Sequence, residues 1–194
     1  MTTSSHSFPT RRALLIAGLA APLGPARASD PEALLRQGGV VIAFRHALAP
    51  GTFDPPGFTL GDCRTQRNLS DEGRAQARRL GEWFAARRLT PAAVRSSPWC
   101  RCVDTATLAF GIPLVEPALG SPAGRAETTN EASLRELRRL LADAAARPGR
   151  FEAWVTHMFV LSALVGGGVS SGEGLVLRAG ANGDPELLAR LTVG

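Results

Sequence analysis

Short apolar runs alternate with amphipathic stretches along this chain. The clearest run lies at 39–44, where apolar and β-branched residues are continuous, as in a strand that is buried on both faces. A second strand is predicted at 152–156. Shorter strands are expected at 92–96, 112–115, 175–178 and 188–193, the last two as a hairpin.

Helices are predicted between these strands. The longest is expected at 71–88, where Ser70 can cap the first turn and one apolar face repeats Ala77, Leu80, Trp83 and Phe84. Asn130 can cap another helix, whose apolar face holds Leu134, Leu137, Leu141 and Ala144. Further helices are expected at 30–37, 99–110 and 159–165. This alternation predicts an α/β fold, a three-layer sandwich with a mostly parallel central sheet flanked by helices.

Residues 1–28 have the pattern of an export signal. Arg11 and Arg12 precede an apolar run at 13–23, and Ala26-Arg27-Ala28 has the small residues expected at a cleavage site. The paired arginines indicate the twin-arginine type, with general secretion as the alternative. The run is shorter than the roughly 20 residues that span a bilayer. We therefore expect a periplasmic or secreted protein with no stable membrane span after cleavage, whose residues 29–194 form one domain.

Composition narrows the chemistry. All 22 basic residues are arginines, so the lysine that a P-loop or a Schiff base needs is missing. Three of these arginines and none of the 17 acidic residues lie in 1–28, so cleavage leaves 19 arginines against 17 acids. This small positive excess gives no reason to expect a nucleic-acid partner.

Three cysteines bear on metal binding and on stability. Cys63, Cys100 and Cys102 show no CxxC or cysteine–histidine spacing, so no metal site and no cofactor is expected. Cys100 and Cys102 are too close in sequence to pair easily. In an exported protein, Cys63 is expected to pair with Cys100 or with Cys102. The alternative is three buried thiols that act as small apolar residues.

Two histidines end apolar runs of predicted strands. His46 and His157 are the only histidines after position 28, and Arg45 directly precedes His46. In open α/β sheets, ligands bind outside the carboxyl ends of the strands, so these side chains are expected to share one site. Arg101 falls in the first turn of the helix at 99–110, where free N–H groups and a guanidinium favour an anion such as phosphate. A lone histidine at a strand end is more often structural. The prediction of a shared site therefore depends on the convergence of His46, His157 and Arg101.

Three motifs occur in order along the chain. They are Arg45-His46-Ala47, Ser96-Ser97-Pro98 through Arg101 to Thr105-Ala106, and Val155-Thr156-His157. Together they resemble the histidine phosphatase superfamily, which has the phosphoglycerate-mutase-like fold. Segments at 54–58, 62–70 and 97–102 look like exported bacterial members near the lipopolysaccharide core heptose phosphatases. Two positions depart from the family pattern: Ala47 replaces the usual glycine, and Met158 follows the second histidine, where a polar or small residue is common.

The resemblance implies roles for these residues. His46 would attack the phosphoryl group and carry it as a phosphohistidine. Arg45, Arg101 and His157 would hold the phosphate oxygens, with no need for a metal. Arg67 is a candidate for a further phosphate or substrate contact.

The proton donor is open at this point. The family often uses a carboxyl group to protonate the leaving oxygen. Asp54 and Glu127 are the main candidates, and Asp62 and Glu131 also lie in loops or at a helix start that could reach the site. No motif decides between them.

The sequence therefore predicts an exported phosphatase that hydrolyses a phosphomonoester, of a small molecule or a glycan, through a phosphohistidine. Two alternatives stay open. One is a non-catalytic phosphate- or anion-binding protein on the same fold, and the other is a phosphoglycerate-type mutase. The physiological substrate and the oligomeric state are not predicted.

Overall fold

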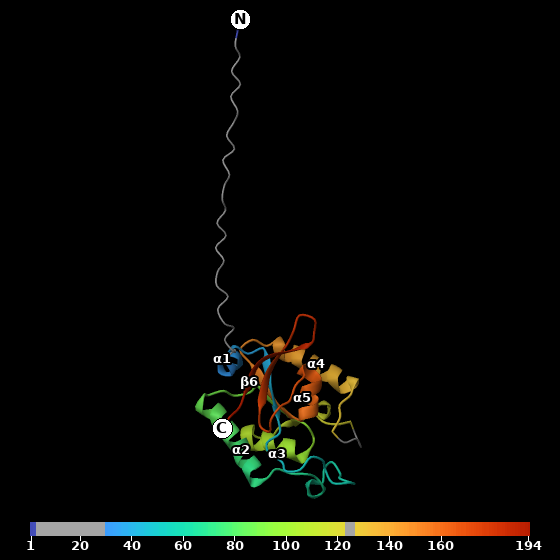
Figure 1. The fold of residues 1–194 in the computed structure, drawn as a ribbon. Coiled ribbons are helices and arrows are strands. Elements are labelled where there is room, and N and C mark those ends of the chain that lie inside the picture. Colours follow the sequence, from blue (N-terminus) through green and yellow to red (C-terminus); the bar gives the residue numbers. More distant parts are fainter. Residues whose placement is uncertain (3–29, 123–126) are drawn as a thin grey trace.

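Six strands form one mixed sheet in the computed structural model, which describes residues 1–2, 30–122 and 127–194 (Figure 1). The strands are β1 (Val40–Arg45), β2 (Ala93–Ser96), β3 (Leu114–Val115), β4 (Phe151–Thr156), β5 (Gly174–Ala179) and β6 (Pro185–Leu191), in the spatial order β3-β2-β4-β1-β5-β6. The first four strands are parallel to one another, whereas β5 is antiparallel to β1 and forms the expected hairpin with β6. Only β5 runs against the other described strands, so the predicted mostly parallel sheet is confirmed.

Helices cover both faces of the sheet, which makes the predicted three-layer sandwich. They are α1 (Pro31–Gln37), α2 (Asp71–Ala86), α3 (Cys100–Phe110), α4 (Glu131–Ala145) and α5 (Met158–Val165), with short 3-10 turns η1 (Cys63–Thr65) and η2 (Pro117–Leu119). Side chains alternate along β1. Val41 and Ala43 pack with residues of α4 and α5, while Val40, Ile42 and Phe44 pack with residues of α1, α2 and α3. Both faces of β1 are therefore buried, as its continuous apolar run predicts.

The helix starts follow the predicted caps. The Oγ of Ser70 accepts the N–H of Gly73 at the start of α2, and Asn130 caps α4 in the same way. α2 ends at Ala86, earlier than the predicted 88, because Arg88 adopts a φ of 52° that a helix does not allow. Other predicted elements are present with ends shifted by up to three residues.

One predicted core residue lies at the edge of the core. Trp83 of α2 is only partly buried, although the apolar pattern placed it on the packed face. The guanidinium of Arg87 lies 4.2 Å from the centre of the Trp83 ring, so a cation–π contact covers one face of this indole.

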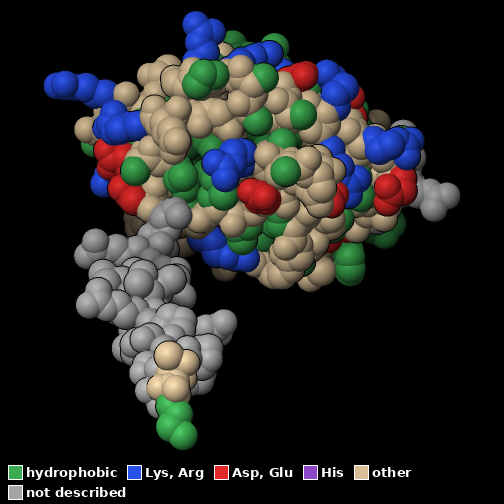
Figure 2. All heavy atoms as spheres, turned by 90° about the horizontal axis from the view of Figure 1, so that it is seen from above, with side chains coloured by type: hydrophobic (Ala, Val, Ile, Leu, Met, Phe, Trp, Pro, Cys, Tyr) green, Lys and Arg blue, Asp and Glu red, His purple; other side chains and the backbone are tan. Residues whose placement is uncertain are grey.

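Charged side chains of both signs share the surface. On the face near α1 in Figure 2, arginines and acidic residues are interspersed and no histidine is visible, in keeping with the 2% exposure of His46 and His157. Within the ranges that the structure describes, no helix has the length and apolar character needed to cross a membrane. Apart from Met1 and Thr2, the predicted export signal lies outside the described residues.

Candidate active site

Strands β1 and β4 bring His46 and His157 together. The two strands are parallel neighbours with Arg45 opposite Thr156, so the residues that follow leave the sheet side by side. The N–H of His46 donates to the carbonyl oxygen of Thr156 at 2.9 Å, and the centres of the two imidazole rings are 5.6 Å apart. The structure therefore places both histidines in one buried site at the carboxyl ends of the strands.

The ring of His46 has a defined proton position. Its Nδ1 lies 2.8 Å from the carbonyl oxygen of Ala47. Because a carbonyl oxygen can only accept, Nδ1 carries the hydrogen and Nε2 carries the lone pair. Burial is the main cause that lowers the pKa of His46 to about 3; three nearby arginines lower it further, and the bond to Ala47 opposes them. Nε2 is therefore unprotonated at neutral pH and can act as a nucleophile.

Two helices hold the turn after His46. The N–H of Ala47 donates to Oγ1 of Thr105 in α3 at 3.0 Å, and this hydroxyl donates to the carbonyl oxygen of Arg101 at 2.7 Å. On the other side, a Cβ at Gly73 of α2 would collide with the carbonyl oxygen of Leu48, so the close approach requires glycine. Sequence reasoning assigns Thr105 no role, although its position in the second motif was the available signal.

His157 is held through both ring nitrogens. Its Nδ1 lies 3.4 Å from Nη2 of Arg101, which can only donate, so Nε2 carries the hydrogen and donates to Oγ of Ser97 at 2.8 Å. The rings of Trp99 and Phe159 flank the imidazole, with centres 5.3 Å and 5.0 Å away. Burial, followed by the charge of Arg101, lowers the pKa of His157 well below its usual value, so the ring is neutral. Sequence reasoning missed the contacts with Ser97 and Trp99.

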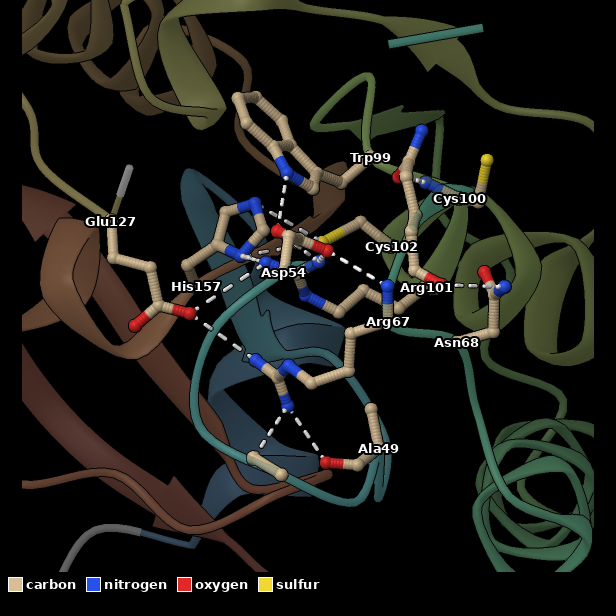
Figure 3. Close-up of polar contacts among 12 residues, drawn as sticks. Ala49, Asp54, Arg67, Asn68, Trp99, Cys100, Arg101, Cys102, Glu127 and His157 are labelled. Atoms are coloured by element: carbon tan, nitrogen blue, oxygen red, sulfur yellow. Dashed lines mark hydrogen bonds and ion pairs between the residues drawn. The ribbon is translucent and has the colours of Figure 1, made fainter. Parts of the chain in front are cut away.

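Arg101 lies in the first turn of α3, as predicted, with 1% of its side chain exposed. Its Nη1 is 2.9 Å and 3.0 Å from the two carboxylate oxygens of Asp54. Asp54 also accepts the backbone N–H of Arg67 at 2.9 Å and the Nε1–H of Trp99 at 3.1 Å (Figure 3). Asp54 therefore binds its own loop to the start of α3 and neutralises a buried guanidinium.

Arg45, Arg67 and Arg101 form what we call the arginine cluster. The Nη2 of Arg67 lies 3.2 Å from Oε1 of Glu127, and its Nη1 donates to two loop carbonyl oxygens. The Nη1 of Arg45 donates to the carbonyl oxygen of Val169 at 2.8 Å. In all three side chains, the Nε–H is buried and has no hydrogen-bond partner among the described residues. Because a buried N–H without a partner is costly, a bound oxyanion would supply acceptors that the cluster lacks.

A cavity of about 140 Å³ lies against Arg45 and Arg67, whereas Arg101, the third member of the cluster, does not line it. Its walls are formed by Arg45, His46, Gly51, Thr52, Arg67, Glu127, His157, Met158 and Phe159. In the described part of the chain, no group of three or more His, Cys, Asp or Glu side chains could hold a metal ion. An unprotonated imidazole and cationic donors around a small cavity suit the transfer of a phosphoryl group.

The candidate proton donors lie in different surroundings. Glu127 lines the cavity. Asp54 does not, and both of its oxygens are occupied by donors at the start of α3, so its geometry fits ion pairing better than proton donation. Asp62 caps η1 and pairs with an exposed arginine, and Glu131 is exposed at the start of α4. The geometry therefore favours Glu127.

A disulfide joins two segments of the site. Cys63 of η1 is bonded to Cys100 at the start of α3, with the Cα atoms 5.7 Å apart. Of the two pairings that the sequence left open, the structure has the one that ties the 48–66 loop to the turn carrying Arg101. Cys102 is a free buried thiol, and burial raises its pKa to about 12.

A family model matches a segment in the middle of the chain. The model of the histidine phosphatase superfamily (branch 1) matches residues 61–117. This segment includes Arg67, Arg101 and Thr105. No curated protein sequence matches the chain.

Solved structures share the fold. The chain is similar to the protein histidine phosphatase SixA complexed with tungstate, with a TM-score of 0.55 and 15% identity over 79% of this chain and 96% of that one. A phosphoserine phosphatase variant from Entamoeba histolytica in complex with phosphoserine has a TM-score of 0.55 and 15% identity, over 79% of this chain and 97% of that one. A mycobacterial glucosyl-3-phosphoglycerate phosphatase in complex with VO3 has a TM-score of 0.53 and 18% identity, over 77% of this chain and 98% of that one. At these identities the similarity establishes the phosphoglycerate-mutase-like fold, and the closer similarity to exported heptose phosphatases stays a prediction.

Proposed function

We propose that this chain, which matches the histidine phosphatase superfamily in fold and over residues 61–117 in sequence, is an exported phosphatase that hydrolyses a phosphomonoester. One observation carries the proposal: His46, with an unprotonated Nε2, lines the same cavity as Arg45 and Arg67. Two of the similar structures are complexes with tungstate or VO3, which are oxyanions like phosphate. A phosphomonoester of a small molecule or a glycan fits the proposal.

The first step forms a bond between Nε2 of His46 and phosphorus. The bond between phosphorus and the leaving oxygen breaks at the same time, and the leaving oxygen takes a proton from Glu127. Glu127 leaves its contact with Arg67 when the phosphoryl group binds there, and it takes this proton from the phosphomonoester, which binds as its monoanion. Arg45 and Arg67, which line the cavity, hold the phosphoryl oxygens, and the nearby charge of Arg101 helps to stabilise the charge that spreads over these oxygens. His157 positions Arg101 through its Nδ1.

The second step releases phosphate. A water molecule takes the place of the leaving group, and Glu127, now a carboxylate, accepts a proton from it. The water oxygen attacks phosphorus, the bond to Nε2 of His46 breaks, and inorganic phosphate leaves. Glu127 passes the proton that it took from water to the departing phosphate, so the enzyme returns to its starting state with His46 neutral and Glu127 a carboxylate paired with Arg67.

A test compares the purified protein with its His46→Ala variant on an aryl phosphate. We expect phosphate release by the wild type and a loss of at least about 10³-fold in the variant. Rapid acid-free quenching with radiolabelled substrate should trap an acid-labile phosphoryl adduct on the wild type only. Thermal unfolding of both proteins shows whether the variant is folded, and equal rates in two folded proteins would refute the nucleophile.

The same assay separates the alternatives. Binding of inorganic phosphate without turnover of any phosphomonoester would favour a non-catalytic anion-binding protein. Transfer of the phosphoryl group to a phosphoglycerate, faster than to water, would favour a mutase.

Export is part of the proposal. It is supported by the sequence pattern at 1–28 and is compatible with the disulfide between Cys63 and Cys100. The test is cell fractionation of the full chain in a bacterial host, in which we expect a shortened protein in the periplasm. Replacing Arg11 and Arg12 with lysine should retain the protein in the cytoplasm if export is of the twin-arginine type, whereas a general secretory signal would tolerate the change.

A further inference from the structure

We infer that Met158 selects phosphomonoesters whose leaving group turns an apolar face toward the cavity. This inference rests on the proposed function and names a substrate class for the same site. In the resemblance to the histidine phosphatases, Met158 departs from the family pattern, which commonly has a polar or small residue after the second histidine.

The fold places Met158 beside the second histidine. His157 is the N-terminal cap of α5, and Met158 is the first residue of that helix. Its side chain lines the cavity, as does that of Phe159. Met158 is nevertheless 44% exposed, so an apolar side chain meets solvent at the edge of a site that is otherwise rich in charge.

Met158 lies close to a group that would hold the phosphate. Its Sδ is 3.9 Å from Nη1 of Arg45, and Arg45 directly precedes the nucleophile. A phosphoryl group held by Arg45 therefore lies beside the thioether, in a cavity that Gly51 and Thr52 also line. We place the leaving group against this thioether.

Phe159 continues the apolar wall that Met158 begins. Its ring is stacked on that of His157, with 5.0 Å between ring centres and 12° between ring planes. This contact makes Phe159 part of the support of His157, whereas Met158 has an exposed face left for a ligand. A thioether chain is flexible and polarizable, so it adapts to aromatic rings and to the carbon faces of sugars alike.

The test compares two substrates that differ in the leaving group. 1-Naphthyl phosphate presents a large apolar face, and glycerol 1-phosphate presents a small polar one. In the Met158→Asn variant, we expect KM for naphthyl phosphate to rise about tenfold, the amount expected for loss of apolar burial against one side chain. KM for glycerol 1-phosphate and the inhibition constant of inorganic phosphate should change less than about twofold, because neither depends on the apolar face.

Two further variants complete the design. Met158→Leu keeps an apolar side chain of similar size and should retain the preference for naphthyl phosphate. Ile112→Asn is the matched control, since Ile112 is 94% exposed between α3 and β3 and does not line the cavity. It should leave both KM values unchanged.

The outcomes separate this inference from the proposed function. If Met158→Asn shifts KM for both substrates and the phosphate inhibition constant alike, Met158 acts by positioning Arg45 and the inference is overturned. An unchanged ratio of the two KM values would overturn it too. If the wild type binds phosphate but hydrolyses no phosphomonoester, these two included, the proposed function fails, and the inference fails with it.

Discussion

Asp54 and Arg101 form an ion pair that is almost closed to water, with 5% and 1% of their side chains exposed. They lie 47 residues apart, and Nη1 of the arginine is 2.9 Å and 3.0 Å from the two carboxylate oxygens. Such a pair orients the guanidinium and compensates its charge. Removal of one partner leaves an uncompensated buried charge, which is strongly destabilising.

The Asp54→Asn variant should therefore lose both stability and activity. We expect the free energy of unfolding to fall by on the order of 3 kcal/mol, and kcat/KM to fall by at least tenfold for every substrate. Urea unfolding and steady-state kinetics measure the two effects. Asp62→Asn is the matched control, because Asp62 pairs with Arg64, whose side chain is 90% exposed, and surface pairs contribute about 0–1 kcal/mol. A stable Asp54→Asn variant that is slow only on poor leaving groups would instead make Asp54 the proton donor.

Glu127→Gln should slow the reaction in a way that depends on the leaving group. The amide cannot give up a proton, so we expect kcat for alkyl phosphates, whose leaving oxygens are basic, to fall by about 10²–10⁴. For 4-nitrophenyl phosphate, whose leaving oxygen needs little protonation, the loss should be small. Glu131→Gln, at an exposed position at the start of α4, should change neither rate. Equal losses on both substrates would show that Glu127 acts through its contact with Arg67.

The disulfide should support the site as well as the fold. Cys63 and Cys100 are 37 residues apart, and a cross-link over a loop of this length stabilises by about 3–4 kcal/mol. The double variant Cys63→Ser/Cys100→Ser should lose about that much stability, together with part of kcat/KM, because the bonded loop also carries Asp54. Reductant should reproduce both losses in the wild type and have no effect on the double variant. In the unreduced, unfolded wild type we expect one reactive thiol, that of Cys102, and three would contradict the pairing.

The two buried histidines predict a pH dependence of stability. The pKa of His46 is about 3 in the folded protein against 6.5 in an unfolded chain, and that of His157 is also lowered. Below about pH 6.5 the two imidazoles therefore bind protons in the unfolded state but not in the folded state. Stability is complete above that pH and falls as the pH is lowered, by up to about 1.4 kcal/mol per pH unit for each histidine.

Urea unfolding at pH 7.5 and pH 5 measures this loss. The His46→Asn variant lacks one of the two imidazoles, so between these pH values it should lose about 2 kcal/mol less than the wild type. An identical loss in both proteins would mean that His46 takes up its proton without unfolding.

Local patterns were enough to predict the layers of the fold and the strand ends at which His46 and His157 lie. The continuous apolar run at 39–44 marks a strand buried on both faces, and Ser70 and Asn130 mark helix starts. These signals arise within a few residues of sequence, because side-chain periodicity and capping bonds are short-range. They also placed His46 and His157 at the carboxyl ends of two strands, and the structure shows that these strands are neighbours.

The tertiary structure alone decided which side chains meet. Cys63 could have paired with Cys100 or Cys102, and nothing local distinguished them. Asp54 and Glu127 were equal candidates for proton donation until the path of their loops placed one against Arg101 and the other in the cavity. The sequence by itself determined the helices and strands, their apolar and polar faces, and the residue types at the site. Which side chains contact one another depends on the paths of loops that join residues tens of positions apart. These paths are set by packing against distant segments, and the periodicity of nearby residues does not encode them.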